Sequence, residues 1–229
     1  MSNHSLGMLA TMLYGCAEPS QLFPDWERDF GRGAPLELEV GPGRGAFALD
    51  HAAAHPEVNS VAIETRRSDC ELIRARAQKR GLRNLMVFQG DAKLLIPRFF
   101  WPGSLAAVHV QFPDPWWKKR HHKRRMVDVD FAGQMRRLLA PGGLVDFRTD
   151  VPAYAREAEH TWLAAGFEKL PDQPAEVLST RERRYAVTGQ PVFRARFRNP
   201  GATDGRPDRD LRPNQDVRTG RDWRDVRRK

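Results

Sequence analysis

The chain has 229 residues, and 38 lysines and arginines against 29 aspartates and glutamates give it a formal charge of +9 at pH 7. This length suits one buried α/β domain with residues left over for tails. The charge favours a polyanionic partner, with general solubility as the alternative. Cys16 and Cys70 are far apart and lack histidines at metal-ligand spacing, so we expect no disulfide framework and no metal site. No apolar run could span a bilayer, so we expect a soluble, cytoplasmic protein.

The pattern of apolar residues and breakers predicts alternating strands and helices. Residues 1–34 show little periodicity, and we expect an N-terminal loop or arm there. Strands are predicted at 36–40, 58–63, 85–89, 105–112 and 144–147. Helices are predicted at 46–55, 66–80, 127–139 and 152–165, and a turn at 141–143. This alternation predicts a mostly parallel central sheet with helices on both faces.

The order weakens toward the C-terminus. Residues 179–185 (STRERRY) are expected to form a charged loop, whereas the strict alternation of 191–197 predicts an antiparallel strand. From Asn199 onward no apolar period remains, which predicts a disordered basic tail. The predicted division is therefore an arm at 1–34, one α/β domain at 35–198 and a tail at 199–229.

The stretch 108–125, VHVQFPDPWWKKRHHKRR, combines three kinds of chemistry. Flanking prolines hold Asp114 in a stiff turn after a strand, where a carboxylate can be aimed at a ligand. The cations that follow would attract a phosphate backbone, and Trp116 and Trp117 offer flat faces for a base. The stretch is thus interpreted as a site for a nucleic-acid base. The alternative is a structural turn before a solvated basic helix.

A second candidate site follows the first predicted strands. Gly41, Gly43 and Gly45 allow the backbone to approach a ligand closely, as in nucleotide-binding α/β units. Glu64 ends the second strand, where a carboxylate can take ribose hydroxyls, and Asp91 follows the third. Glu39 is acidic within an apolar strand and is either a site residue or an outward-facing edge carboxylate.

The glycine turn alone does not separate two classes of enzyme. Residues 41–46 satisfy both G-x-G-x-G, associated with S-adenosylmethionine, and G-x-G-x-x-A, the dinucleotide fingerprint. A methyltransferase is favoured over a nicotinamide-dependent oxidoreductase, because several acids suit a cationic sulfonium cofactor better than a pyrophosphate. A non-catalytic RNA-binding protein, and a methyltransferase with another acceptor, remain as alternatives.

Together these motifs resemble a known family. LEVGPGRG, AIE at 62–64, GDA at 90–92, FPDPWWKKRHHKRR, and PGG followed by FRTD closely resemble the tRNA (guanine-N7)-methyltransferases over roughly residues 22–197. The resemblance implies a class I methyltransferase fold with a Rossmann-like sheet. It also implies transfer of a methyl group from S-adenosylmethionine to N7 of a guanine in the tRNA variable loop. Whether the enzyme is a monomer or a homodimer stays open.

The resemblance also assigns residues to the site. It implies that the cofactor-binding residues are Glu39, Gly41, Gly43, Gly45, Glu64, Asp91 and Asp114, with Asp114 also catalytic. It implies substrate contacts by Lys118, Asp150, Ser179, Glu182 and Arg184. Three positions depart from the family pattern: Ser179 replaces a threonine, Arg181 an aromatic residue and Trp117 a proline.

The chemistry of guanine limits what these residues have to do. N7 carries a lone pair and no proton, so Asp114 is predicted to orient the base and offset its developing positive charge rather than to abstract a proton. Asp150 or Asp114 would accept hydrogen bonds from guanine N1–H and the exocyclic amine, although Asp150 could instead cap the helix starting at Pro152. Phosphate contacts are predicted for Lys118, Lys119, Arg120 and Arg124.

Overall fold

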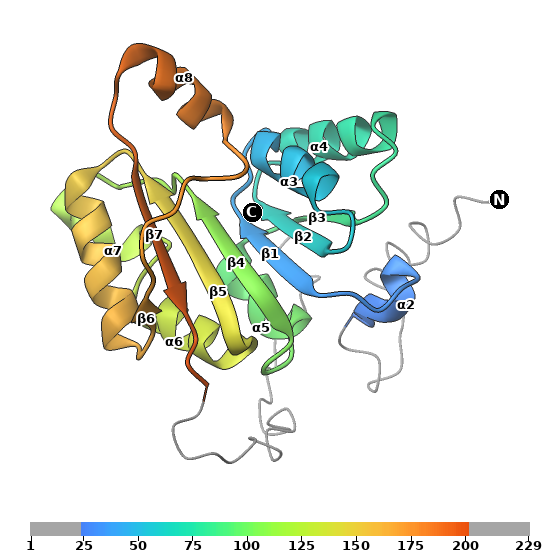
Figure 1. Ribbon diagram of the computed structural model, residues 1–229, viewed down its shortest axis with the longest axis horizontal. Coiled ribbons are helices and arrows are strands. Elements are labelled where there is room, and N and C mark those ends of the chain that lie inside the picture. Colours follow the sequence, from blue (N-terminus) through green and yellow to red (C-terminus); the bar gives the residue numbers. More distant parts are fainter. Residues whose placement is uncertain (1–23, 202–229) are drawn as a thin grey trace, which may run out of the picture.

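The computed structural model describes residues 24–201, which form a seven-stranded sheet flanked by helices (Figure 1). The strand order is β3-β2-β1-β4-β5-β7-β6. The strands are β1 (Leu36–Val40), β2 (Asn59–Glu64), β3 (Leu85–Gln89), β4 (Leu105–Gln111), β5 (Leu139–Thr149), β6 (Glu168–Lys169) and β7 (Phe193–Arg198). Strands β1 to β5 pair in parallel, and β7 is antiparallel to both β5 and β6. The predicted mostly parallel sheet with a late antiparallel strand is confirmed.

Helices cover both faces of the sheet. The described helices are α2 (Trp26–Phe30), α3 (Ala46–Ala54), α4 (Arg67–Lys79), α5 (Ala92–Phe99), the 3-10 helix η2 (Lys119–Arg124), α6 (Val129–Leu138), α7 (Pro152–Ala164) and α8 (Thr180–Thr188). Helices α2, α5, α6 and α7 pack on the large apolar core on one face. Helices α3 and α4 cover a smaller apolar cluster on the other. Among the described helices, none combines the length and apolar character needed to cross a bilayer.

Alternation along the central strands gives the two faces different chemistry. Adjacent partners in the register of β1, β4, β5 and β7 form an apolar row of Leu38, Val108, Val145 and Phe197. The neighbouring row faces the opposite side and contains Glu39, His109, Asp146 and Arg196. Because β1, β4 and β5 lie inside the sheet, Glu39, His109 and Asp146 are held among other elements rather than at an edge.

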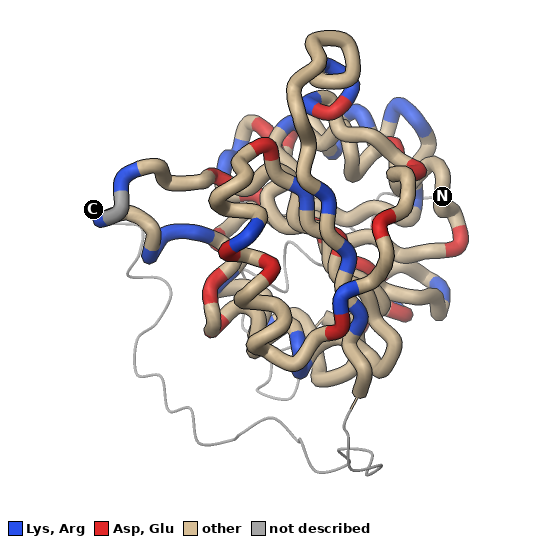
Figure 2. Tube along the Cα trace, turned by 60° about the vertical axis from the view of Figure 1, so that its left-hand side comes forward, with Lys and Arg blue, Asp and Glu red and all other residues tan. Residues whose placement is uncertain are grey.

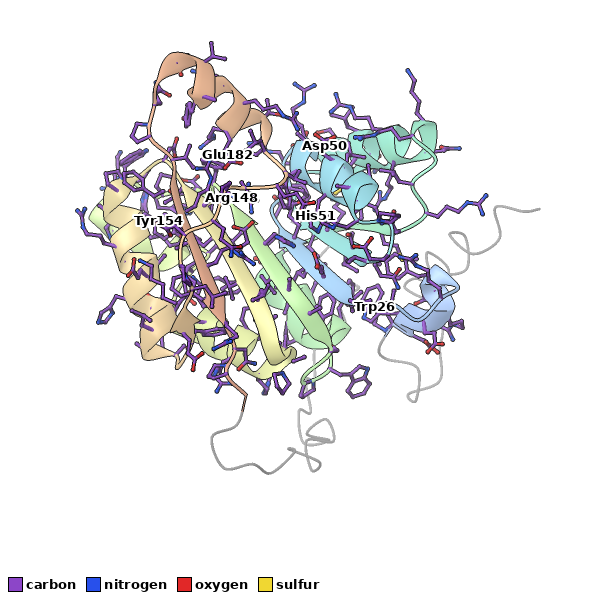
Figure 3. The ribbon with its side chains drawn as sticks, viewed as in Figure 1. Trp26, Asp50, His51, Arg148, Tyr154 and Glu182 are labelled. Atoms are coloured by element: carbon purple, nitrogen blue, oxygen red, sulfur yellow. The ribbon has the colours of Figure 1, made fainter. Side chains whose placement is uncertain are left out.

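Part of the predicted N-terminal arm is folded. Residues 1–23 lie outside the described part of the chain, but residues 26–30 form α2, whose N-cap Asp25 accepts a hydrogen bond from the Arg28 amide. Trp26 is buried in the large core, where its Nε1 donates to the Phe99 carbonyl at 3.0 Å (Figure 3). A single tryptophan between polar residues gives no period, so the sequence pattern does not reveal this anchor.

Three further segments differ from the predictions. The charged loop expected at 179–185 is wrong, because Ser179 and Glu182 form a reciprocal capping box that starts α8 and Gly189 ends it. The turn at 141–143 is a bulged part of β5. Asn199, expected to open the tail, is buried and donates to the Leu139 carbonyl at 2.7 Å, while the predicted tail residues 202–229 lie outside the described part of the chain.

Candidate functional site

The predicted site residues meet at one edge of the sheet. Strand order reverses between β1 and β4, and this edge carries the residues after β1, β2, β3, β4 and β5. Ligands of open α/β sheets bind at such a switch point beyond the carboxyl ends of the strands. Helix α8 stands beyond the ends of β4 and β5 (Figure 1).

The glycine loop after β1 is held by the acid that ends β2. Glu64 Oε2 accepts a hydrogen bond from the Gly43 amide at 2.9 Å, and Oε1 accepts from the Arg66 amide at 3.0 Å. Gly41 and Gly43 have φ values of 68° and 55°, and a Cβ on either would meet no atom within 4 Å. These glycines therefore supply a left-handed backbone beside open space, as a loop that approaches a ligand requires.

Gly45 has a different role from the first two glycines. A Cβ at this position would lie 2.4 Å from Cγ1 of Ile73 in α4, well inside van der Waals contact. Its φ of 75° is also left-handed, and it is the N-cap of α3. Gly45 thus serves the close packing of the loop and α3 against α4.

Glu39 is buried within β1, and the alternative of an outward-facing edge carboxylate is wrong because β1 lies between β2 and β4. Burial raises the pKa of Glu39 to about 8, although His109 and Arg148 act to lower it. Among the described residues, its Oε2 has no hydrogen-bond partner. A buried carboxylate with a free oxygen favours a cationic ligand, because a nearby positive charge offsets the desolvation of the ionised form.

Asp91 caps α5, a helix that the sequence pattern did not predict. Its Oδ1 accepts a hydrogen bond from the Lys93 amide at 2.9 Å, and the residue remains exposed at the end of β3. The capping bond holds this carboxylate at the switch edge, although it accounts for only one of the two oxygens.

Asp114 lies in a strained turn after β4. Phe112 and Trp116 both have positive φ values, 49° and 47°, which non-glycine residues rarely adopt. Asp114 Oδ1 accepts a hydrogen bond from the Trp116 amide at 2.9 Å, and the residue is exposed. Two such residues on either side of one carboxylate cost about 1–3 kcal/mol each, a kind of strain that clusters at functional sites. The turn therefore presents Asp114 to solvent at the switch edge in a fixed backbone.

The basic run after this turn divides into free and anchored cations. Lys118, Arg120 and Arg124 are exposed, and the Arg124 guanidinium lies 5.0 Å from the centre of the Trp116 ring. Arg125 is buried instead, where it donates to the Pro115 carbonyl at 2.8 Å and pairs with Glu157. In Figure 2, lysines and arginines gather along a loop that projects from the body of the protein. The exposed cations are available to an anion, whereas Arg125 fixes the base of the loop.

The late motif residues belong to the start of α8. Glu182 is 2% exposed; its Oε2 accepts from Nη1 of Arg148 at 2.8 Å, and its Oε1 accepts from Nε of Arg194 at 2.9 Å. Figure 3 shows Arg148 and Glu182 together where α8 meets the sheet. Ser179 is also buried and caps the helix, while Arg184 is exposed. Ser179 and Glu182 thus anchor α8, and of the three predicted substrate contacts in this motif Arg184 is the one exposed to solvent.

Asp150 follows β5, and its expected alternative role as a helix cap is wrong. The N-cap of α7 is Val151, without a side-chain capping bond. Asp150 Oδ2 instead accepts a hydrogen bond from the Tyr185 hydroxyl at 2.6 Å and lies 3.4 Å from Nη1 of Arg181. Both partners come from α8, so this helix reaches the substrate residue predicted at the end of β5.

A chain of buried and half-buried charges runs beneath α3 and was not predicted from the sequence. Glu37 Oε2 lies 2.7 Å from His51 Nε2 and 2.8 Å from His109 Nε2, and Asp146 lies 3.7 Å from the other ring nitrogen of His109. Burial alone would lower the pKa of His109, but Asp146 and Glu37 outweigh it and raise that pKa to about 9. Asp146 is in turn paired with Arg148 at 2.6 Å. The charges therefore alternate in sign from β1 to α8.

Glu37, His51 and His109 also offer three ligand atoms within 4.8 Å of one another, the one such group among the described residues. The contacts of 2.7 and 2.8 Å between the carboxylate and the two rings are hydrogen-bond distances. Two ligands of a tetrahedral zinc ion would lie about 3.3 Å apart. The geometry therefore fits a shared ion pair better than a metal centre.

The fold is that of class I methyltransferases. The 16S rRNA methyltransferase KamB superposes with a TM-score of 0.57 at 21% identity, covering 78% of this chain and 94% of KamB. The aminoglycoside resistance methyltransferase NpmB1 gives 0.55 at 20% identity, covering 75% of this chain and 90% of NpmB1. A family model described as "Putative methyltransferase" matches residues 33–195.

Two curated relatives define the family more closely. The tRNA (guanine-N(7)-)-methyltransferase of Myxococcus xanthus (strain DK1622) is 47% identical over 184 residues, covering 77% of this chain and 89% of the relative. The enzyme of that name from Anaeromyxobacter dehalogenans (strain 2CP-C) is 51% identical over 184 residues, covering 77% and 92%. The chain belongs to the tRNA (guanine-N7)-methyltransferase family.

Proposed function

We propose that the protein transfers a methyl group from S-adenosylmethionine to N7 of a guanine in the variable loop of tRNA. The observation that carries this proposal is the meeting of an open glycine loop, the buried acid Glu39 and the Asp114 turn at one switch edge. The names of the relatives support tRNA as the acceptor. Because tRNA is a cytoplasmic molecule, we place the activity in the cytoplasm.

The chemistry of the edge fits a sulfonium cofactor. When bound, S-adenosylmethionine supplies an electrophilic methyl group. Glu64 lies beside the Gly43 amide and contributes a carboxylate at the open glycine loop. Glu39, whose raised pKa favours its protonated form in the free protein, would ionise beside a bound sulfonium. Asp91 adds an exposed carboxylate at the end of β3. A nicotinamide dinucleotide is disfavoured, because its pyrophosphate would meet these acids.

The role of Asp114 follows from the electronic change at guanine. Positive charge appears on the ring as N7 gains a methyl group, and a carboxylate fixed beside the ring stabilises that charge. Asp114 is held by its bond to the Trp116 amide, so little reorganisation is needed during the reaction. Asp150 would accept hydrogen bonds from the N1–H and the exocyclic amine of the base. These two carboxylates would orient guanine and select it over adenine.

The decisive experiment uses labelled S-adenosylmethionine and unmodified tRNA, followed by chain cleavage at 7-methylguanine to locate the methyl group. We expect one label in the variable loop, and none in a transcript whose variable-loop guanine is replaced by adenine. Label in another RNA but not in tRNA would contradict the proposed acceptor. Stabilisation of the protein by NADH but not by S-adenosylhomocysteine in a thermal shift would contradict the proposed cofactor.

Asp114→Asn tests the role of the carboxylate. We expect the single-turnover rate to fall about 100-fold or more with near-normal cofactor binding, since one preorganised electrostatic contact is worth that much. Asp172→Asn, which alters an exposed aspartate in the segment before α8, is the matched control. Retention of a normal single-turnover rate by Asp114→Asn would contradict the assignment.

The exposed cations of the basic run are proposed to bind tRNA phosphates. Lys118→Ala and Arg124→Ala should each weaken tRNA binding and reduce the slope of log K against log salt by roughly one. Arg98→Ala is the control, because Arg98 is exposed in the last turn of α5, toward the opposite edge of the sheet. Equal salt slopes for all three variants and the wild type would contradict the assignment of Lys118 and Arg124 to the tRNA interface.

A further inference from the structure

Helix α8 brings an aromatic residue and a cation to the substrate side of the switch edge. Arg181 and Tyr185 are four residues apart and so share one face of the helix. The Arg181 guanidinium lies 5.2 Å from the centre of the Phe112 ring, and the Tyr185 ring packs edge-on against the same ring at 6.4 Å. Both side chains also reach Asp150. The end of β4, the end of β5 and α8 therefore meet in one cluster.

The helix that carries this cluster is anchored by buried contacts. Glu182 lies one turn before Tyr185 and is fixed by ion pairs with Arg148 and Arg194. Ser179 completes the capping box at the start of the helix. The backbone position of Tyr185 is thus set by buried ion pairs and by the helix cap.

The contacts of Asp150 are unequal. The Tyr185 hydroxyl donates to Oδ2 at 2.6 Å, a short bond between a neutral donor and a carboxylate. Arg181 reaches the same oxygen only at 3.4 Å and is about half exposed, so solvent screens its attraction. Among the described residues, none donates a hydrogen bond to Oδ1 of Asp150. Tyr185 therefore fixes the carboxylate through one oxygen and leaves the other available.

The hydroxyl of Tyr185 keeps its proton under ordinary conditions. Its hydrogen bond to Asp150 raises the pKa of Tyr185, because ionising the phenol would place two negative charges side by side. The phenol remains a donor, so it cannot exchange roles with the carboxylate. This fixes the direction of the contact across neutral pH.

We propose that Tyr185 is a positioning residue that orients Asp150 for recognition of the guanine edge. The inference rests on the proposed function, since it assigns Asp150 to the guanine N1–H and amine. Tyr185 itself acts through Asp150, whose free oxygen faces the base. Guanine recognition then depends on α8 as well as on the strand ends.

Tyr185→Phe removes the hydroxyl and keeps the ring that packs on Phe112. We expect the KM for tRNA to rise about tenfold, as the loss of a hydrogen bond to a charged group allows, while kcat at saturating tRNA changes less than about twofold. Binding of S-adenosylhomocysteine and the Tm should not change. Val187→Ala, an exposed position on the same helix, is the matched control and should behave as wild type.

A second readout separates orientation from general weakening. A tRNA carrying inosine at the target lacks the exocyclic amine, and the wild type should prefer guanine over inosine. Tyr185→Phe should reduce this preference, and Asp150→Asn should abolish it. Adding Tyr185→Phe to Asp150→Asn should change neither the KM for tRNA nor the guanine preference further, because both substitutions remove the same contact.

Two outcomes would overturn the inference alone: a wild-type KM and guanine preference in Tyr185→Phe, or fully additive effects in the double variant. A wild-type protein that transfers no methyl group to tRNA would overturn the proposed function, and this inference with it. The two failures are therefore distinguishable from the wild-type assay.

Discussion

Two neighbouring rows of side chains cross the same four strands and show opposite ways of filling a protein interior. One row consists of Leu38, Val108, Val145 and Phe197, all of them 0% exposed. The other consists of Glu39, His109, Asp146 and Arg196. The apolar row is stabilised by burial alone, which is not directional. At the centre of the charged row, His109 and Asp146 are stable in their ionised forms only while each keeps a partner of opposite sign.

The two faces also differ in the predicted site residues that they hold. Helices α5, α6 and α7 pack on the apolar face. None of the predicted site residues belongs to its apolar core; those nearby lie in the turns at the switch edge. The charged face contains Glu39 and leads through Arg148 and Glu182 to α8. The predicted site residue Glu39 and the anchor of α8 therefore lie on the face whose stability depends on electrostatic pairing.

Arg148→Met should give the largest loss of stability on the charged face. The variant leaves Asp146 and Glu182 without their shared cation, and removing one partner of a buried pair costs about 3–5 kcal/mol. Phe131→Ala on the apolar face should cost a similar 3–5 kcal/mol by leaving a cavity. Urea unfolding of the full chain measures both values.

A second substitution then distinguishes the two mechanisms. Adding Glu182→Gln to Arg148→Met should recover part of the lost stability, because Glu182 then keeps only Arg194 as a cationic partner and the glutamine carries no buried charge. Adding Met135→Ala to Phe131→Ala should lower stability further, since each truncation removes buried apolar area. Equal behaviour of the two double variants would show that the faces do not differ as argued.

Glu39→Gln should stabilise the protein without cofactor, and increasingly so as pH rises. Because burial raises the pKa of Glu39 to about 8, its contribution to stability is complete below about 4.5 and is lost as pH rises through 8. By pH 8 the free energy of unfolding of the variant should exceed that of the wild type by about 2 kcal/mol. This is less than the full pKa shift implies, because structural relaxation and water penetration reduce the cost of ionising a buried carboxylate. Thermal unfolding at pH 5 and pH 8 measures the difference.

The same variant should lose affinity for S-adenosylmethionine, because a bound sulfonium favours the ionised form of Glu39 and glutamine cannot ionise. Glu57→Gln, which alters an exposed acid before β2, is the control and should show neither effect. A difference in stability between Glu39→Gln and wild type that does not change from pH 5 to pH 8 would contradict the buried, protonated state of Glu39.

Ser179→Ala should give the smallest effect, a loss of about 0.5–2 kcal/mol from the removal of one helix cap. The loss should be local to α8, because Glu182 would still be held by Arg148 and Arg194. Hydrogen exchange of the α8 amides measures it, with the amides of α6 as the internal reference. Faster exchange in both helices would mean that the cap stabilises the whole sheet.

Sequence pattern predicted the parallel sheet well because alternation, glycine turns and helix caps are local signals. Strands at 36–40 and 85–89 match the structure residue for residue, and the acids expected at the switch edge do lie there. The start of α8 carried a readable signal too, since Ser179 and Glu182 have the spacing of a capping box. The many arginines in that segment led to the prediction of a charged loop instead of a helix start.

The charged chain could not be predicted from pattern. Glu37, His109 and Asp146 each occupy a position that ordinarily faces water in an alternating strand, and their pairing depends on the register between strands. Tyr185 gave no signal either, because its partner lies 35 residues away in sequence. Long-range pairing of polar groups needs the folded backbone.

The alternating chain of charges also restricts how this protein can diverge. A change at His109, Asp146 or Arg148 alters the sign balance of its neighbours, so a tolerated substitution at one position requires a matching substitution at the next. Relatives should therefore carry this set of residues either intact or replaced together by apolar ones. Such joint replacement would appear as covariation across β1, β4, β5 and α8, while Leu38 and Val108 would drift independently within the apolar residues.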